Sequence, residues 1–251
     1  TYPYATPETA TASLYEALAT VWAETDRPGR IIVAPGTYPE IKTLGSVTSP
    51  IEIIGPDDPE KAILRFKSSD FSVGFVLGHL QAKLSGVTIN GTTYCDVDSN
   101  YVLGGALRIE DGVVSNCVIT GFNTASGIRG TSTLAVRGGL VTHTAVTNNP
   151  NSSAFARGVL GVYMDGGTLE HSIISDNPFY GDRAEAGALW QKGGTVRDCR
   201  YRNGSGGGKT GIIITGGLVD GLAVSNFNEI GWSYQRPVNI AGGVLQNFVI
   251  E

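Results

Sequence analysis

A glycine turn recurs along most of this chain, and each copy is followed by the same short apolar pattern. The six turns are Asp111-Gly112, Gly138-Gly139, Gly166-Gly167, Gly193-Gly194, Gly216-Gly217 and Gly242-Gly243. The steps between their second residues are 27, 28, 27, 23 and 26 residues. Repetition at this period is typical of a solenoid, in which each coil buries its apolar face against its neighbours. The 251 residues are therefore predicted to form one elongated domain, 1–251.

Aligning the coils on their turns places apolar residues at fixed addresses. Before the turn, two columns read Leu107, Leu134, Val162, Leu189, Ile212 and Val238, then Ile109, Val136, Met164, Gln191, Ile214 and Ile240. After the turn, three columns begin at Val114, Cys117 and Ile119 and continue in every later coil. Within a strand the spacing is two residues, which is the period of a strand and not of a helix. We predict an all-β fold with three short parallel strands per coil, stacked about 4.8 Å apart.

Two polar columns mark the corners of the coil. The first reads Asn116, His143, His171, Asp198, Gly221 and Asn247. These residue types tolerate positive φ best, so we predict a sharp bend through one left-handed residue. The alternative is that His143 and His171, neighbours in the stack, form a metal or proton-transfer pair. The second column reads Asn148, Asp176, Asn203 and Asn226, and is predicted to be a structural ladder of stacked hydrogen-bonding side chains.

Charge and cysteine content exclude several classes of function. There are 23 acidic and 18 basic residues, a net charge of -5 and no basic block, so nucleic acid is not an expected partner. No apolar run is long enough to cross a bilayer, so no membrane insertion is expected. The three cysteines, Cys95, Cys117 and Cys199, form no Cys-x-x-Cys pair and indicate neither a disulfide framework nor a zinc site. Cys117 and Cys199 share an address and are predicted to be small buried side chains.

The two ends of the chain differ. Residues 1–30 are predicted to be a cap, because Ser13 and Glu16 form a capping box ahead of a helix of about twelve residues that Pro28-Gly29 ends. Residues 31–80 read as irregular first coils and residues 81–251 as regular ones. The C-terminal end has no closing segment. We expect another coil, a further domain or an end-to-end contact beyond Glu251.

The capping helix, the strand that leads into Pro35-Gly36-Thr37-Tyr38, and the repeated glycine-turn pattern resemble the right-handed parallel β-helix of the pectin-lyase-like superfamily. The likeness covers nearly the whole chain. It implies the fold strongly and the activity weakly, because this superfamily includes lyases, hydrolases, tailspikes and adhesins. It also implies an extracellular or cell-surface location. No catalytic signature of the superfamily transfers to a residue here; Arg27-Pro28-Gly29-Arg30 is only a superficial echo of the Arg-x-Pro-x-x-Arg element of pectate lyases.

Variable segments precede the first strand of each coil and would wall a groove whose floor is that strand. The outward residues of this floor form two columns, Arg108, Ala135, Tyr163, Trp190, Ile213 and Asn239, and Glu110, Arg137, Asp165, Lys192, Thr215 and Ala241. Aromatic rings stack on sugar faces, and arginine and lysine pair with carboxylates. The candidate glycan-binding residues are Tyr163, Trp190, Arg108, Glu110, Arg137 and, from the preceding segment, Phe179, Tyr180 and Arg183. The alternative is that opposite charges on adjacent coils only stabilise the stack.

Three hypotheses follow from the groove and the repeat. The leading one is a non-catalytic module that binds polysaccharide or cell-surface glycan in the groove. The second is a lyase or hydrolase acting on a uronate-containing glycan, with Asp165, Lys192, Asp182 and Glu185 as catalytic candidates. The third is a stalk or assembly subunit. No cofactor is expected, with calcium at Asp96 and Asp98 as a weak alternative.

Overall fold

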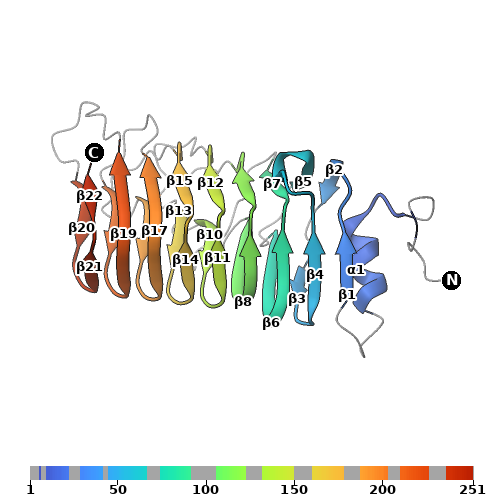
Figure 1. Cartoon of the computed structure of the whole chain (residues 1–251), viewed down its shortest axis with the longest axis horizontal. Coiled ribbons are helices and arrows are strands. Elements are labelled where there is room, and N and C mark those ends of the chain that lie inside the picture. The colour runs from blue at the N-terminus through green and yellow to red at the C-terminus, as the bar shows by residue number, and fades with distance from the viewer. Residues whose placement is uncertain are drawn as a thin grey trace, which may run out of the picture.

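The computed structural model describes residues 6, 10–22, 29–41, 45–66, 74–91, 106–122, 132–149, 160–177, 187–202, 210–225 and 236–250. Successive coils stack along one long axis, with the helix α1 (Leu14–Trp22) at one end and the last described coil at the other (Figure 1). The predicted fold class is confirmed, since the chain is an all-β parallel β-helix with three strands per coil and an N-terminal helix.

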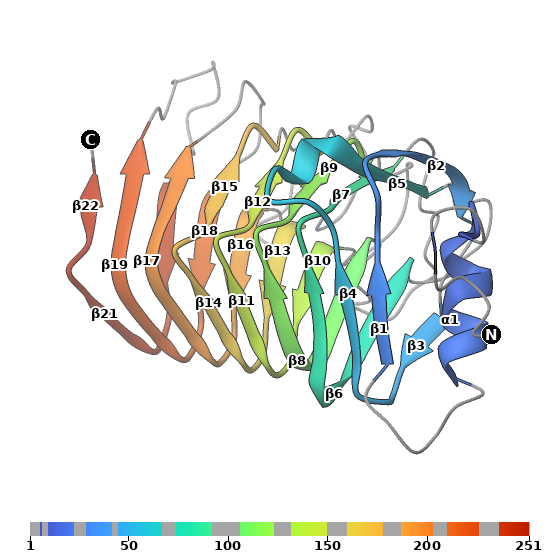
Figure 2. The same ribbon diagram turned by 45° about the vertical axis from the view of Figure 1, so that its right-hand side comes forward.

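Parallel strands pair in three stacks along the β-helix, one for each strand of the coil, and long strands that cross a corner join the stacks into one hydrogen-bonded sheet (Figure 2). We call each stack a sheet. The first sheet contains β3 (Gly45–Val47), the first halves of β6 (Phe75–Ser85) and β8 (Leu107–Ser115), β10 (Ser132–Val136), β13 (Leu160–Met164), β16 (Gly187–Gln191), β18 (Thr210–Ile214) and β20 (Arg236–Ile240). The second contains β1 (Gly29–Ile32), β4 (Ile51–Ile54), the second halves of β6 and β8, β11 (Leu140–Thr142), β14 (Thr168–Glu170), the first halves of β17 (Thr195–Arg202) and β19 (Leu218–Ser225), and β21 (Val244–Gln246). The third contains β2 (Gly36–Ile41), β5 (Ala62–Phe66), β7 (Thr88–Gly91), β9 (Val118–Thr120), β12 (Ala145–Thr147), β15 (Ile173–Ser175), the second halves of β17 and β19, and β22 (Val249–Ile250).

The predicted register of the coils is confirmed. Residues that share an address pair across adjacent strands, as Val141 pairs with both Val114 and Leu169. Their side chains enclose a single core that runs from α1 to the last coil. Cys117 and Cys199 are both buried in this core, as predicted, and burial raises the pKa of their thiols to about 12 and about 11.

The bends also match the prediction. Asn116, His143, His171, Asp198 and Asn247 have φ between 47° and 51°, and Gly221 has φ 75°. At the glycine turn both residues are constrained by the coil beneath. A Cβ on Gly138 would collide with the carbonyl oxygen of Glu110, and Gly139 adopts φ 66°. Close approach of the two backbones and the left-handed conformation together explain the repeated Gly-Gly pair.

The predicted polar ladder at the end of the third strand is displaced by one residue. Asn148 and Asp176 are exposed and adopt positive φ, while the buried ladder is built by Asn149 and Asn177. The Asn149 amide donates to Asn177 Oδ1 at 2.9 Å, and Asn177 Nδ2 donates to the Val146 carbonyl at 2.8 Å. The left-handed residue breaks the strand alternation, so its own side chain points outward and the next side chain points inward, where it satisfies the turn backbone. The predicted members Asn203 and Asn226 lie outside the described residues.

Helix α1 covers the N-terminal end of the core. Leu14 and Leu18 are buried, and Ala17 and Val21 pack beside them, so the predicted apolar face of the helix is confirmed. The Glu16 amide donates to Ser13 Oγ at 3.3 Å, which is half of the predicted capping box. The helix has nine residues, against about twelve predicted.

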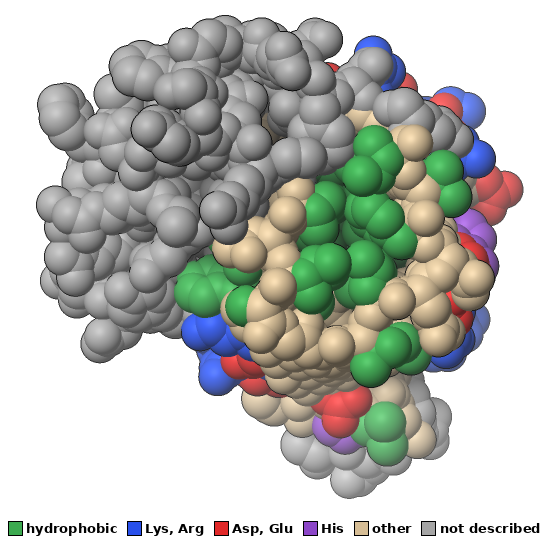
Figure 3. All heavy atoms as spheres, turned by 90° about the vertical axis from the view of Figure 1, so that its left-hand side faces the viewer, with side chains coloured by type: hydrophobic (Ala, Val, Ile, Leu, Met, Phe, Trp, Pro, Cys, Tyr) green, Lys and Arg blue, Asp and Glu red, His purple; other side chains and the backbone are tan. Residues whose placement is uncertain are grey.

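The opposite end of the β-helix is apolar. Ile240, Val244, Val249 and Ile250 are 50–60% exposed, and Figure 3 shows hydrophobic side chains gathered in the centre of this face. The strands of the last described coil, β20, β21 and β22, pair on one side only among the described strands.

Candidate ligand-binding site on the first sheet

One outward column of the first sheet runs across β8, β10, β13, β16 and β18. In it Arg108, Ala135, Tyr163, Trp190 and Ile213 pair in register. Ala135 and Tyr163 form a cluster with Trp190 that is separate from the core, so the predicted outward direction of Trp190 is confirmed.

The predicted open groove floor is wrong for most of this column. Ala135, Tyr163 and Ile213 are only 0%, 3% and 5% exposed, whereas Arg108 and Trp190 are half-buried. The physical reason lies in the column itself, because covering apolar and aromatic side chains removes about 25 cal/mol of unfavourable hydration for each Å² buried. Of these five side chains a ligand at this face can therefore reach only Arg108 and Trp190, and not a continuous aromatic floor.

The charged side chains of the second outward column lie in one row with Arg108. We call this row, which contains Arg108, Glu110, Arg137, Asp165 and Lys192, the charged row. Arg108 Nε lies 2.9 Å from Glu110 Oε1, and Arg137 Nη1 lies 3.5 Å from the same oxygen. Arg137 Nε lies 3.4 Å from Asp165 Oδ2. The side chain of Arg137 is 43% exposed, so each pair contributes about 1 kcal/mol or less. These contacts support the stabilising role that the sequence left open as an alternative.

Lys192 continues the charged row in a different way. Among the described residues its ammonium forms no ion pair with a carboxylate, and it lies 4.3 Å from the centre of the Trp190 ring and 5.6 Å from that of Tyr163. The two rings meet edge to face with their centroids 5.8 Å apart. A cation over an indole face is stabilised by about 0.5–2 kcal/mol, which orders the side chain without neutralising its charge.

Trp190 and Tyr163 differ in how their polar atoms are satisfied. The Trp190 Nε1 atom is buried and, within the described part of the chain, has no acceptor. Such an orphaned donor costs about 1–3 kcal/mol. The Tyr163 hydroxyl, in contrast, donates to Asp165; burial, and then the charge of this carboxylate, raises the pKa of Tyr163. Among the described residues, the Lys192 ammonium therefore has no anionic partner and the buried Trp190 N–H has no acceptor.

The remaining predicted site residues are not brought together by the described structure. Phe179, Tyr180, Asp182, Arg183 and Glu185 all lie outside the described residues, as do the calcium candidates Asp96 and Asp98. Of the catalytic candidates only Asp165 and Lys192 are described. Arg137 lies between Glu110 and Asp165 and contacts both carboxylates, so these two do not face each other across an open gap.

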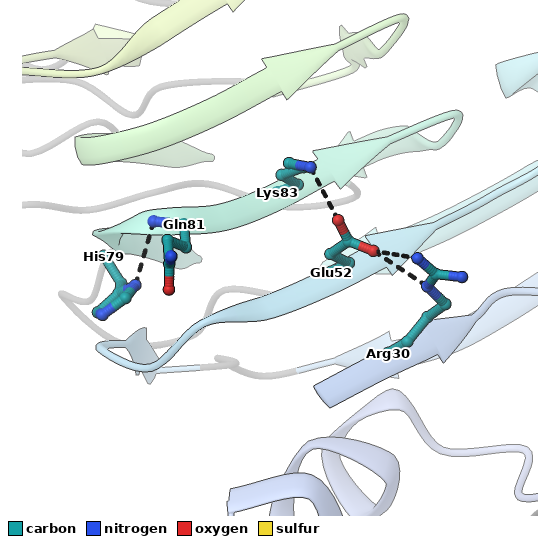
Figure 4. Close-up of polar contacts among 5 residues, drawn as sticks. All are labelled: Arg30, Glu52, His79, Gln81 and Lys83. Atoms are coloured by element: carbon teal, nitrogen blue, oxygen red, sulfur yellow. Dashed lines mark hydrogen bonds and ion pairs between the residues drawn. The ribbon is translucent and has the colours of Figure 1, made fainter. Parts of the chain in front are cut away.

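Sequence reasoning missed a second row of ion pairs, which lies on the second sheet (Figure 4). Glu52 on β4 accepts from Arg30 on β1 at 2.7 Å and from Lys83 on β6 at 2.8 Å. The hydrogen bonds from Lys83 and Arg30 lower the pKa of Glu52. Alternating charge at 22- and 31-residue spacing was the signal, but the irregular first coils hid the shared address.

Sequence reasoning also treated Gln191 as one more member of an apolar column. It is fully buried, and its Nε2 donates to the carbonyls of Gly194 and Leu218 at 3.1 and 3.0 Å. The amide thus ties the glycine turn to the adjacent coil.

Neither metal ligands nor relatives give a further guide to the site. No group of three or more His, Cys, Asp or Glu side chains in the described segments is arranged to hold a metal ion. None of the described helices is long and apolar enough to cross a bilayer. Comparison of the chain with profiles of protein families, with curated proteins and with solved structures returned no match.

Proposed function

We propose that this chain is a secreted or surface-displayed β-helix module of the pectin-lyase-like superfamily that binds an anionic polysaccharide at the Lys192 end of the charged row. One observation carries most weight. The Lys192 ammonium has no carboxylate partner among the described residues and is held over Trp190. The carboxylate of a uronate polymer would neutralise this cation, and a sugar ring would pack against the partly exposed indole.

The stacked architecture favours a polymer over a small molecule. Equivalent side chains repeat along the axis about every 4.8 Å, so Arg137 and Lys192, two coils apart in one column, are separated by about 10 Å. Both side chains are exposed. A linear anion lying along the first sheet would meet these two cations in turn, with the partly exposed ring of Trp190 beside Lys192 on the same coil.

The test is binding of the chain to polygalacturonate and alginate, with dextran as a neutral comparison, measured by calorimetry. Lys192→Ala removes the unneutralised cation and is expected to weaken binding about tenfold or more. Trp190→Phe keeps an aromatic ring but replaces the larger indole that holds Lys192, so an intermediate loss is expected. Lys83→Ala is the matched control, because this lysine lies on the second sheet and is paired with Glu52. Equal affinity of the native chain and Lys192→Ala would contradict the proposal.

A second candidate function is cleavage of the same class of polymer. Asp165 and Lys192 occupy one column on consecutive coils, which would put a carboxylate and a cation against one ligand. Incubation with the uronate polymers would then release shorter products, and Asp165→Asn would abolish release. Binding without product release would favour the non-catalytic module.

A further inference from the structure

Two histidines face each other at one corner of the β-helix, on the side of β11 and β14 away from the glycine turns. His143 follows β11 and His171 follows β14, at the same address on adjacent coils. Their ring centroids are 5.2 Å apart, the planes are tilted by 36°, and both side chains are exposed. The pair lies apart from the charged row, so a role for these histidines is independent of glycan binding at Lys192.

The bend at this address does not require histidine. Asn116, Asp198 and Asn247 occupy the same corner on other coils with φ of 50°, 47° and 51°, against 49° and 48° for His143 and His171. The left-handed conformation is thus equally accessible to smaller polar residues. Histidine at two consecutive corners adds something that the turn itself does not need, namely two imidazole nitrogens on one surface.

A neighbouring hydroxyl group can fix the tautomer of His143. Its Nδ1 lies 2.8 Å from the hydroxyl oxygen of Thr142. When Nδ1–H donates to this oxygen, Nε2 carries the free lone pair and points away from the bond. Histidines that bind metals are held in this way, with one ring nitrogen bonded to an oxygen and the other to the metal.

We propose that His143 and His171 form a site for one divalent transition ion of the Zn²⁺, Ni²⁺ and Cu²⁺ class, with solvent completing the coordination. Imidazole nitrogen suits these ions, and bond lengths of about 2.0–2.1 Å to both rings require only rotation of side chains whose backbones are one coil apart. No third candidate ligand joins the pair among the described residues. Two protein ligands favour a modest affinity, tightest for Cu²⁺. The bound ion would clamp adjacent coils together.

The substitution that tests the site is already present in the repeat. His143→Asn and His171→Asn introduce the residue that Asn116 and Asn247 show to be compatible with the bend. The remaining histidine of the chain is His79, which lies outside this corner. Its Nδ1 accepts a hydrogen bond from the backbone N–H of Gln81 (Figure 4). His79→Asn is therefore the matched control for loss of one imidazole.

The experiment titrates the full chain, in turn, with ZnCl₂, NiCl₂ and CuCl₂ and measures heat of binding and the midpoint of thermal unfolding. We expect one ion per chain and a midpoint that rises with metal concentration, because a ligand that binds only the folded state stabilises it. Each corner variant should bind at least tenfold more weakly and lose the metal-dependent rise, while His79→Asn should keep both. The paramagnetic resonance spectrum of the Cu²⁺ complex should indicate two nitrogen ligands in the native chain and one in either corner variant.

Thr142→Val provides a second test that leaves both imidazoles in place. Loss of the hydroxyl that orients His143 should weaken binding severalfold without changing the number of bound ions. Retention of native affinity by either His→Asn variant, or no binding of any of the three ions by the native chain, would overturn the proposed site.

Discussion

The inward and outward faces of the same strands differ in how closely neighbouring coils constrain them. Inward, most addresses keep an apolar side chain from coil to coil, as in the column from Val114 to Val219, and Gln191 is an exception. Outward, the column of Glu110 passes through arginine, aspartate and lysine to threonine. An inward side chain is enclosed by the equivalent residues of both adjacent coils, whereas an outward one meets water or a ligand. The inward residues are therefore determined mainly by the fold. Changes of residue type along an outward column are a better indication of function.

One inward address holds a thiol or a hydroxyl on four consecutive coils before Leu222 occupies it on the next coil. At this address Cys117, Thr144, Ser172 and Cys199 all donate to the carbonyl two residues earlier, at 3.3, 3.0, 2.7 and 3.2 Å. A thiol and a hydroxyl thus perform the same task, which is to satisfy a carbonyl beside the bend.

The largest expected difference between the two faces comes from two neighbours on β9. Ile119 is fully buried and Val118 points outward. Ile119→Ala should lower the free energy of unfolding by about 2–5 kcal/mol, because it leaves a cavity that rigid adjacent coils cannot fill. Val118→Ala should lower it by less than about 1 kcal/mol. Urea unfolding followed by circular dichroism measures both, and similar losses would break the distinction between the faces.

The thiol and hydroxyl column predicts a dependence on alkaline pH. Burial, above all other causes, raises the pKa of Cys117 to about 12 and of Cys199 to about 11, from 9.0. The thiols therefore lose their protons at lower pH in the unfolded chain than in the folded one. Their contribution to the free energy of unfolding is fully present below pH 9 and is lost as the pH rises through the folded-state pKa values. Near pH 10.5 each thiol accounts for a loss on the order of 2 kcal/mol.

Cys117→Thr and Cys199→Ser provide the matched comparison for this pH dependence, since threonine and serine already occupy the address at Thr144 and Ser172. The double variant should be close to native at pH 7 and should lose less stability between pH 9 and 11. Parallel pH profiles of the native and double-variant proteins would mean that the thiols do not contribute.

A smaller effect is expected at the centre of the charged row. Arg137→Ala removes the cation shared by Glu110 and Asp165, and because these side chains are partly exposed, stability should fall by about 1 kcal/mol or less. Binding of a uronate polymer should weaken severalfold, and more at 50 mM than at 300 mM salt, because screening already weakens the native interaction at high salt. A large loss of stability with unchanged binding would assign the row to the fold alone.

The sequence alone predicted the interior better than the surface. A period of 23 to 28 residues and two-residue alternation were enough to assign the inward columns and the left-handed corners, because both follow from backbone geometry that every coil repeats. The prediction placed the polar ladder one residue too early. Asn148 and Asn149 are adjacent, and only the left-handed conformation of Asn148 determines that Asn149 faces inward. The prediction that the Tyr163 side chain is exposed on the first sheet was wrong, because strand pairing determines which way a side chain points but not what covers the outer face of the sheet.

The smallest expected effect concerns the row on the second sheet, which serves as the internal comparison for the charged row. There Glu52 is paired on both sides, so no cation is left for a ligand. Glu52→Gln leaves Lys192 untouched and frees Arg30 and Lys83 on the second sheet, so it should not weaken polymer binding, and it should lower the midpoint of thermal unfolding by about 2 °C or less. Because its hydrogen-bonded cations lower the pKa of Glu52, its contribution is present above the unfolded value and disappears as the pH falls through the folded one. The native and variant midpoints should therefore draw together as the pH falls below 4.5, the ordinary value for Glu, and a difference that acid leaves unchanged would show that the carboxylate charge is not its source.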